Sequence, residues 1–171
     1  MDPLILTAEL DPVSFSAYDA LRQAHFPDRG YVLPAHLTLF HNLPGEALDE
    51  IAGALTAIAA RTPPLPLRFA SLFGMGRGVA VAVEAPGLKA LRSSLAALWE
   101  DALTPQDRKV RLHVTVQNKV APEAARALLS DLSAGFEPHD GTCTGLLLWH
   151  YRGGPWDPAG RFPFSAAGSS R

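Results

Sequence analysis

Two short stretches of this 171-residue chain carry a histidine and a threonine two positions apart, flanked by apolar residues. The first reads HLTL at positions 36–39, and the second reads HVTV at positions 113–116. With six histidines and eight threonines in the chain, a His-x-Thr triplet is expected about 0.3 times by chance. Two copies in the same apolar frame therefore indicate a common role.

The alternation of side chains along a β-strand decides which residues of each motif can act together. Residues two apart in a strand point to the same face. His36 and Thr38 therefore share one face, opposite the leucines, and His113 and Thr115 share a face in the same way. Because the apolar face must pack in a core, the histidine–threonine face must line a polar surface.

Duplicated lobes packed about a pseudo-twofold axis would bring the two sets together across a cleft. Two imidazoles and two hydroxyls facing one another suit phosphodiester chemistry without a metal. In-line attack on phosphorus needs a base at the entering oxygen and an acid at the leaving oxygen. Histidine has an ordinary pKa of about 6.5, so one ring can be neutral while the other is protonated. Threonine hydroxyls can donate hydrogen bonds to the non-bridging oxygens, whose charge grows during the reaction.

The elements that position these motifs repeat at a fixed offset. His113 follows His36 by 77 residues (113 − 36), and the same shift brings five successive predicted elements into register. The sequence therefore predicts one domain over residues 1–171, built from internal repeats at about 3–73 and 79–151.

Hydrophobic periodicity and turn residues predict the elements of each repeat. Strands are expected at 4–9, 36–40, 67–73, 79–84, 111–119 and 144–151, and helices at 12–26, 45–60, 87–103 and 122–132. The predicted fold is α+β, with two pseudo-symmetric lobes from a duplicated β-α-β-α-β unit. Antiparallel sheets would face each other across a central cleft, with the helices outside.

Composition limits the possible partners and location. Hydrophobic residues make up 47% of the chain and charged residues 19%, enough apolar material for a core. A net charge of -2 argues against binding to duplex DNA or an anionic membrane. The lone Cys143 cannot form an internal disulfide, which favours a reducing cytoplasm. No stretch approaches the length of a membrane span, and composition leaves the oligomeric state open.

Paired His-x-Thr-x strands in two such lobes resemble the two-histidine phosphoesterase superfamily, which includes bacterial 2'-5' RNA ligases and cyclic phosphodiesterases. The late stretch WHYRGGPW at 149–156 also resembles the bacterial 2'-5' RNA ligase-like branch. The resemblance covers residues 3 to 164. It implies that His36 and His113 are catalytic and that Thr38 and Thr115 hold the phosphate.

The resemblance also implies a reaction that needs no metal, cofactor or ATP. A 2',3'-cyclic phosphate on a nucleotide or RNA end would open to a 2'-phosphate. With an RNA 5'-hydroxyl in place of water, the same acid–base pair would form a 2'-5' linkage, with the strained ring supplying the free energy. The expected partner is thus a nucleotide cyclic phosphate or an RNA end. The alternative is a non-catalytic module that binds a nucleotide or RNA end in the same place.

Residues next to the motifs are further candidates for substrate contacts. Arg111 precedes His113 on the same predicted face, whereas Pro34 holds the matching place before His36, so the phosphate site is expected to be asymmetric. Gln117 continues the face of His113, where it either touches ribose or phosphate or forms a solvated strand end.

Two aromatic residues have open assignments. By strand parity Phe40 shares the face of His36, where it either stacks on a base or packs in the core. In the last long strand, either Trp149 and Tyr151 or His150 and Arg152 border the cleft. The resemblance favours Tyr151.

The remaining motifs are interpreted as structural. The glycine-rich GMGRG at 74–78 lacks the Gly-Lys-Ser/Thr ending of a phosphate loop and is expected to be a hairpin turn. A zinc site at the two motif histidines would need further ligands, which no spacing supplies. His25, His41 and His139 match no motif, and parity places His41 opposite His36.

Overall fold

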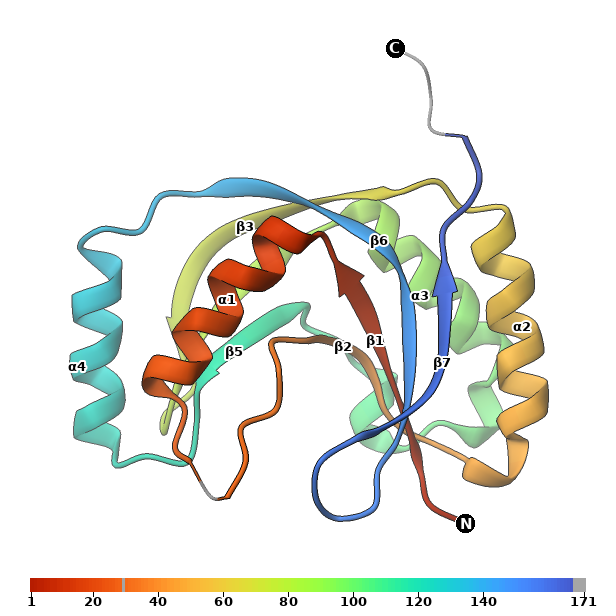
Figure 1. Cartoon of the computed structure of the whole chain (residues 1–171), viewed down its shortest axis with the longest axis horizontal. Coiled ribbons are helices and arrows are strands. Elements are labelled where there is room, and N and C mark those ends of the chain that lie inside the picture. The colour runs from red at the N-terminus through yellow and green to blue at the C-terminus, as the bar shows by residue number, and fades with distance from the viewer. Residues whose placement is uncertain (29, 168–171) are drawn as a thin grey trace.

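The computed structural model describes residues 1–28 and 30–167, and its elements follow the predicted order (Figure 1). The strands are β1 (Leu4–Leu10), β2 (Leu37–Leu43), β3 (Leu65–Gly74), β4 (Val79–Glu84), β5 (His113–Gln117), β6 (His139–His150) and β7 (Asp157–Pro163). The α-helices are α1 (Pro12–His25), α2 (Leu48–Ala60), α3 (Pro86–Leu98) and α4 (Pro122–Ser133). Three short 3-10 helices are η1 (Gly45–Ala47), η2 (Glu100–Ala102) and η3 (Pro105–Arg108).

The α+β class is confirmed, but the two expected sheets are joined into one. Within the described residues the seven strands form an antiparallel sheet in the order β1-β2-β5-β4-β3-β6-β7, and an additional β1–β6 pairing closes a ring. The long strand β6 makes this closure possible. Its first part, His139–Cys143, pairs with β3, and its remainder pairs with β1 on one edge and β7 on the other.

The helices lie outside the strands, as expected. Figure 1 shows α1 and α4 toward one end of the molecule and α2 and α3 toward the other. Helix α1 begins at Asp11, which accepts a hydrogen bond from the backbone N–H of Ser14 (3.0 Å) and precedes a proline in the first turn. The same carboxylate accepts the backbone N–H of Thr142 (2.8 Å), so the start of α1 is tied to β6.

Apolar burial fixes the positions of the two motif strands. Leu37, Leu39, Val114 and Val116 are fully buried, as alternation predicts. Each side chain of this kind contributes about 1.5–3 kcal/mol when it is removed from water. A slip of one residue would expose all of them, so the strand register is strongly specified.

The glycine-rich stretch between β3 and β4 is a hairpin turn, which confirms that prediction. The backbone N–H of Met75 donates to the carbonyl of Gly78 (2.9 Å), and Gly76 has a φ of +81°. A Cβ at Gly78 would lie 1.9 Å from the carbonyl oxygen of Gln117, so this position must be glycine for β5 to approach. No helix within residues 1–28 and 30–167 is long and apolar enough to cross a membrane.

Candidate active site

The two His-Thr motifs lie on neighbouring strands, because β2 pairs with β5. Their antiparallel register places Leu37 opposite Val114. In such a pair, the residue after one member faces the residue before the other, so each motif histidine lies opposite the threonine of the other motif. The facing pairs are His36 with Thr115 and His113 with Thr38. We call these four residues the motif set.

The motif set is accessible, whereas the apolar residues between its members are not. All four side chains of the set are half-buried, and Leu37 and Val114 are fully buried. The strand pairing thus gathers two imidazoles and two hydroxyls on one face. No group of three or more His, Cys, Asp or Glu side chains in the described part of the chain could hold a metal ion.

Both motif histidines are oriented by the same local hydrogen bond. Nδ1 of His36 lies 2.8 Å from the carbonyl oxygen of Pro34, and Nδ1 of His113 lies 2.6 Å from that of Arg111. A carbonyl can only accept, so each Nδ1 carries the proton of the neutral ring. Nε2 is therefore left on each ring to take or give a proton.

The surroundings of His36 favour its neutral form. Its ring packs against Trp156, with ring centroids 4.6 Å apart. Desolvation lowers the pKa of His36 to about 4, against the opposing effect of its bond to the Pro34 carbonyl. The positive charge of Arg22, and that of the other nearby histidines when protonated, adds to the lowering. His36 is therefore an unprotonated imidazole at neutral pH.

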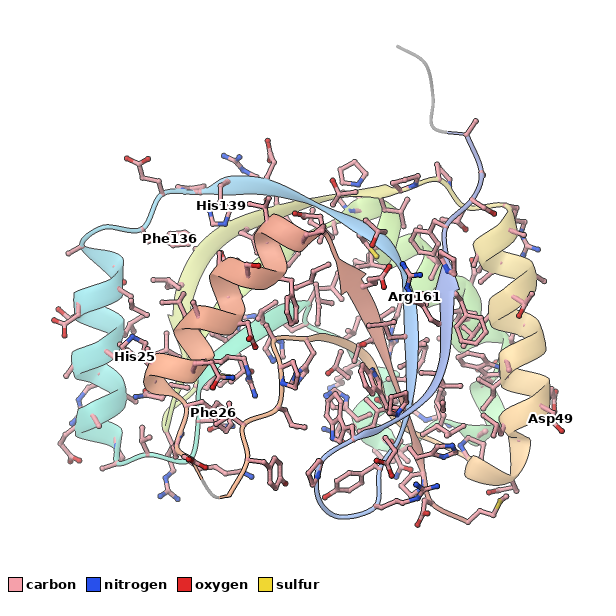
Figure 2. All side chains as sticks on the ribbon, in the orientation of Figure 1. His25, Phe26, Asp49, Phe136, His139 and Arg161 are labelled. Carbon is pink, nitrogen blue, oxygen red and sulfur yellow. The ribbon has the colours of Figure 1, made fainter. Side chains whose placement is uncertain are left out.

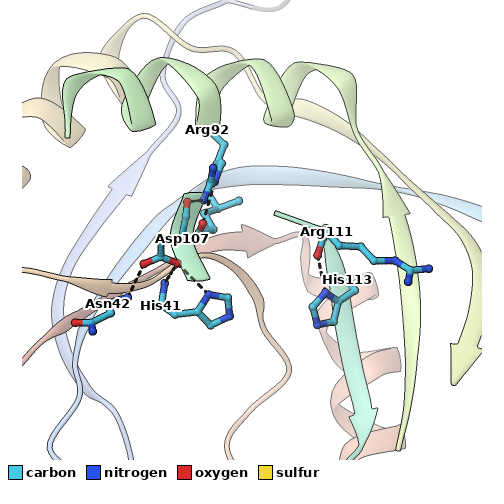
Figure 3. A network of polar contacts seen from close by, with 7 residues as sticks. His41, Asn42, Arg92, Asp107, Arg111 and His113 are labelled. Carbon is cyan, nitrogen blue, oxygen red and sulfur yellow. Dashed lines mark hydrogen bonds and ion pairs between the residues drawn. The ribbon is translucent and has the colours of Figure 1, made fainter. Parts of the chain in front are cut away.

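His113 has different neighbours. Its ring meets the edge of Phe73 at a centroid distance of 6.0 Å. The guanidinium carbon of Arg111 lies 3.6 Å from the Phe73 ring centroid. Figure 3 shows the Arg111 side chain directed away from the imidazole of His113, while its carbonyl oxygen accepts the ring N–H. Arg111 thus stacks on the aromatic neighbour of His113 and is exposed.

A large pocket opens beside His36. Its volume is about 760 Å³, and its walls come from β1, the start of α1, β6, β7 and the loops that lead into β2 and β7. Its aromatic lining residues are Phe15, Tyr31, Trp149 and Trp156. The indole N–H of Trp149 donates to the hydroxyl of Thr7 (3.0 Å), which fixes the plane of that ring. We call this cavity the aromatic pocket.

The charged groups of the aromatic pocket are paired with each other. Arg161, labelled in Figure 2, donates from Nε to Glu9 (2.7 Å), and Thr144 donates to the same carboxylate (2.8 Å). The hydrogen bond from Arg161 holds the pKa of Glu9 below its ordinary value, although burial acts in the opposite direction. The walls of the pocket are therefore mainly apolar, and the charges of Glu9 and Arg161 neutralise each other.

Of the two aromatic residues weighed together at the end of β6, Trp149 and not Tyr151 lines this pocket. Trp149 lines the aromatic pocket, whereas Tyr151 is not among the lining residues and is 43% exposed. Because β6 ends at His150, Tyr151 follows the strand, and its backbone N–H donates to the Pro3 carbonyl (3.0 Å). Trp156, within the stretch that carried the family resemblance, supplies the ring that contacts His36.

Phe40 is a core residue, and the reason is a β-bulge. Thr38 pairs with Thr7 of β1, but the next residue of β1, Leu6, pairs with Phe40, so Leu39 is the extra residue. The bulge turns Phe40 inward, where it is fully buried and meets Trp99 edge-on (5.4 Å). Base stacking by Phe40 is thereby excluded in this arrangement.

The same irregularity occurs at the end of β5. Thr115 pairs with Ala80 of β4, and Gln117 pairs with the adjacent Val79, so Val116 is the extra residue. Gln117 is consequently buried rather than part of the open face. Its Oε1 has no hydrogen-bond partner within residues 1–28 and 30–167. The predicted substrate contact of Gln117 is therefore not supported by its position.

Arg22 is a site residue that the sequence analysis missed. It is buried, donates from Nε to the Leu33 carbonyl (2.8 Å) and from Nη1 to the Thr115 carbonyl (2.7 Å), and its guanidinium lies over the Phe26 ring. Burial lowers the pKa of Arg22 to about 10, so it remains a cation. One side chain thus connects the segment before His36 to the second motif. The available signal was its position eight residues after Ser14, on the buried side of α1.

The fold and the motif set together define a domain of the two-histidine phosphoesterase type. The family model described as the 2'-5' RNA ligase superfamily matches residues 10–155. The chain belongs to this superfamily. This confirms the resemblance carried by the two His-x-Thr stretches.

Two solved structures share the fold of this chain. The crystal structure of TT0787 of Thermus thermophilus has a TM-score of 0.71 and 19% identity, over 96% of this chain and 98% of that one. The crystal structure of E. coli LigT complexed with 3'-AMP has a TM-score of 0.63 and 18% identity, with the same coverage. No curated protein matches the sequence.

Proposed function

We propose that the chain is a metal-independent and ATP-independent phosphoesterase acting on 2',3'-cyclic phosphates of nucleotides or RNA ends. The main support is the motif set, in which two histidines and two threonines come from one antiparallel strand pair. In-line displacement needs proton-transfer groups at two oxygens and donors to the non-bridging oxygens. Membership of the 2'-5' RNA ligase superfamily is consistent with this chemistry.

In the hydrolytic direction, we assign the general base to His36, because its lowered pKa keeps the ring neutral. Nε2 of His36 takes a proton from water as the water oxygen bonds to phosphorus. The bond from phosphorus to the 3' oxygen breaks, and His113 donates a proton to that oxygen. The product is a 2'-phosphate with a free 3' hydroxyl. Thr38 and Thr115 donate hydrogen bonds to the non-bridging oxygens.

The same groups can form a 2'-5' linkage. An RNA 5'-hydroxyl replaces water as the nucleophile, His36 accepts its proton, and the 3' oxygen leaves as before. One P–O bond forms and one breaks, so no nucleotide cofactor is required. Relief of strain in the five-membered cyclic phosphate favours the step.

The aromatic pocket supports a nucleoside substrate. It adjoins His36, and its walls include two tryptophan rings. Base–aromatic stacking tolerates any base because every base has a π-face. The LigT structure among the neighbours is complexed with 3'-AMP, which is consistent with a nucleotide ligand for this fold. We place the base of the reacting nucleotide in this pocket and its cyclic phosphate over the motif set.

We further propose that the chain arose by internal duplication, as its repeated element order suggests. Support comes from the two bulges, which occur one residue after each motif threonine, at Leu39 and Val116. The positions 39 and 116 differ by 77, the offset of the two histidines.

The deciding experiment is incubation with four nucleoside 2',3'-cyclic phosphates and a cyclic-phosphate-ended RNA, all with chelator present. We expect turnover to a 2'-phosphate, identified by ³¹P NMR. A 3'-phosphate product would contradict the assigned bond. Binding of panel members without any turnover would replace the enzyme with the non-catalytic binding module.

A further inference from the structure

His41 lies on the open face of β2, although simple alternation along the strand places it on the opposite face. The bulge at Leu39 puts two consecutive residues, Leu39 and Phe40, into the core. The next residue, His41, is exposed, and a second register shift follows between Phe40 and Leu43. His41 lies close enough to His36 for its charge, when the ring is protonated, to lower the pKa of His36, so it is on the side of His36 and Thr38. Its imidazole is 41% exposed. Figure 3 shows the rings of His41 and His113 directed to the same side of their strands.

The ring of His41 is held by a buried carboxylate. The Asp107 side chain is fully buried and accepts the backbone N–H groups of His41 and Asn42, each at 2.8 Å. Its Oδ1 also lies 3.1 Å from Nδ1 of His41. Hydrogen bonds from His41 and the backbone hold the pKa of Asp107 below its ordinary value, although burial alone would raise it. The carboxylate is therefore ionised at neutral pH.

Arg92 holds Asp107 and the bulged segment of β2 in position. It is buried on α3 and donates from Nε to the Leu39 carbonyl (3.1 Å) and from Nη2 to the Asp107 carbonyl. The guanidinium of Arg92 is thus hydrogen-bonded to both the bulged segment of β2 and helix η3. With Nδ1 of His41 held by Asp107, Nε2 is the ring atom free to meet a ligand. When the ring is protonated, Nε2 offers an N–H to an anion.

His41 lies at the opposite end of the motif set from the aromatic pocket. The chain runs from His36, just before β2, past Thr38 to His41, whereas the lining of the pocket includes His36 and the two residues before it. A strand rises about 3.3 Å per residue, so His41 lies within about 10 Å of Thr38 along β2. A ligand with its base in the pocket and its cyclic phosphate over the set can extend toward His41.

We propose that His41 binds a second anionic group of the substrate, the 5'-phosphate or 5'-phosphodiester of the nucleotide that carries the cyclic phosphate. This inference rests on the proposed function and adds a preference for RNA ends and 5'-phosphorylated nucleotides over nucleosides with a free 5'-hydroxyl. A charge-assisted hydrogen bond from Nε2 supplies the recognition.

The test compares one nucleoside 2',3'-cyclic phosphate with the same compound bearing a 5'-phosphate. For the wild type we expect kcat/KM to be about tenfold higher for the 5'-phosphorylated compound, mainly through KM. His41→Asn should reduce this ratio to near one. His25→Asn, a histidine replacement at the end of α1, should retain it. Thermal melting of each variant checks that the fold is kept.

The possible failures are distinguishable. If the wild type turns over neither compound, the proposed function fails and the role of His41 fails with it. If it turns over both with a ratio near one, or if His41→Asn keeps the wild-type ratio, the preference for a second anion is wrong while the phosphoesterase assignment stands.

Discussion

His36 and His113 share one local geometry but occupy two different environments. Each Nδ1 is bonded to the carbonyl two residues earlier, and each ring lies opposite the threonine of the other motif. Beyond that, His36 packs against Trp156 at the aromatic pocket, whereas His113 meets Phe73, which carries Arg111 on its face. The local hydrogen bonding of the two rings is therefore the same, while their surroundings differ.

His139 shows that a hydrogen bond from Nδ1 to the carbonyl two residues earlier does not by itself make a site. Nδ1 of His139 lies 2.9 Å from the Glu137 carbonyl, the same arrangement as in the motifs. Its Nε2, however, lies 2.9 Å from the hydroxyl of Tyr18, and its ring stacks on Phe69. Among the described residues, Nε2 of His36 and of His113 has no such hydrogen-bond partner, which distinguishes these two rings from that of His139.

The largest expected effect tests what His36 and His113 have in common, the proposed role of each ring in proton transfer. His36→Ala and His113→Ala should each lower kcat for cyclic-phosphate opening by roughly 10²- to 10⁴-fold, because each removes one proton-transfer group. Steady-state rates with one nucleoside cyclic phosphate provide the measurement, and His25→Ala serves as the control. A rate near that of the wild type in either motif variant would contradict the acid–base pair.

The next effect concerns the threonines, which face the opposite histidines. Thr38→Val and Thr115→Val should each lower kcat/KM by about 10- to 100-fold, because a hydrogen bond to a charged group contributes about 1.5–3 kcal/mol. The matched control is Thr56→Val, which removes a hydroxyl that donates to the Ala52 carbonyl on α2. Losses confined to one threonine would show that a single motif holds the phosphate.

Much of the fold was predictable because it depends on periodicity and turn chemistry. The buried leucines of β2, the helix start at Asp11 and the glycine hairpin before β4 all follow from local rules. The four residues of the motif set were also identified from sequence, because alternation in a strand places His36 with Thr38 and His113 with Thr115.

The errors come from features that a repeating pattern does not contain. A bulge shifts the phase of alternation, which moved Phe40 and Gln117 into the interior and His41 onto the open face. Closure of the ring depends on β6 changing partners along its length, which strand patterns do not encode. The buried bonds of Arg22 join residues far apart in the chain, so no local signal reports them.

A paired substitution sharpens the difference between the two histidine environments. Trp156→Ala should raise KM for nucleoside cyclic phosphates about tenfold, since base–aromatic stacking contributes about 1–3 kcal/mol. It should also admit water to His36, so the acid limb of the kcat/KM profile moves from near pH 4 upward toward about 6.5. Phe73→Ala, on the side of His113, should leave that limb where it is. An acid limb that is already near 6.5 in the wild type would contradict the assignment of His36 as base.

The smallest expected effect concerns the contribution of the His36 ring to the free energy of unfolding. The pKa of His36 is lowered from 6.5 to about 4 in the folded chain, so between these values the unfolded chain binds more protons. Stability must therefore fall as the pH decreases from 6.5 toward 4. His36→Gln removes this contribution and should flatten the decline by about 1 kcal/mol, after allowance for water access to a half-buried ring.

Glu9 and Asp107, whose pKa values are also lowered, lose their contributions to stability mainly at the acid end of this range. Urea unfolding at pH 6.5, 5.5 and 4.5 separates the two sources, and parallel curves for variant and wild type would show that His36 is not desolvated.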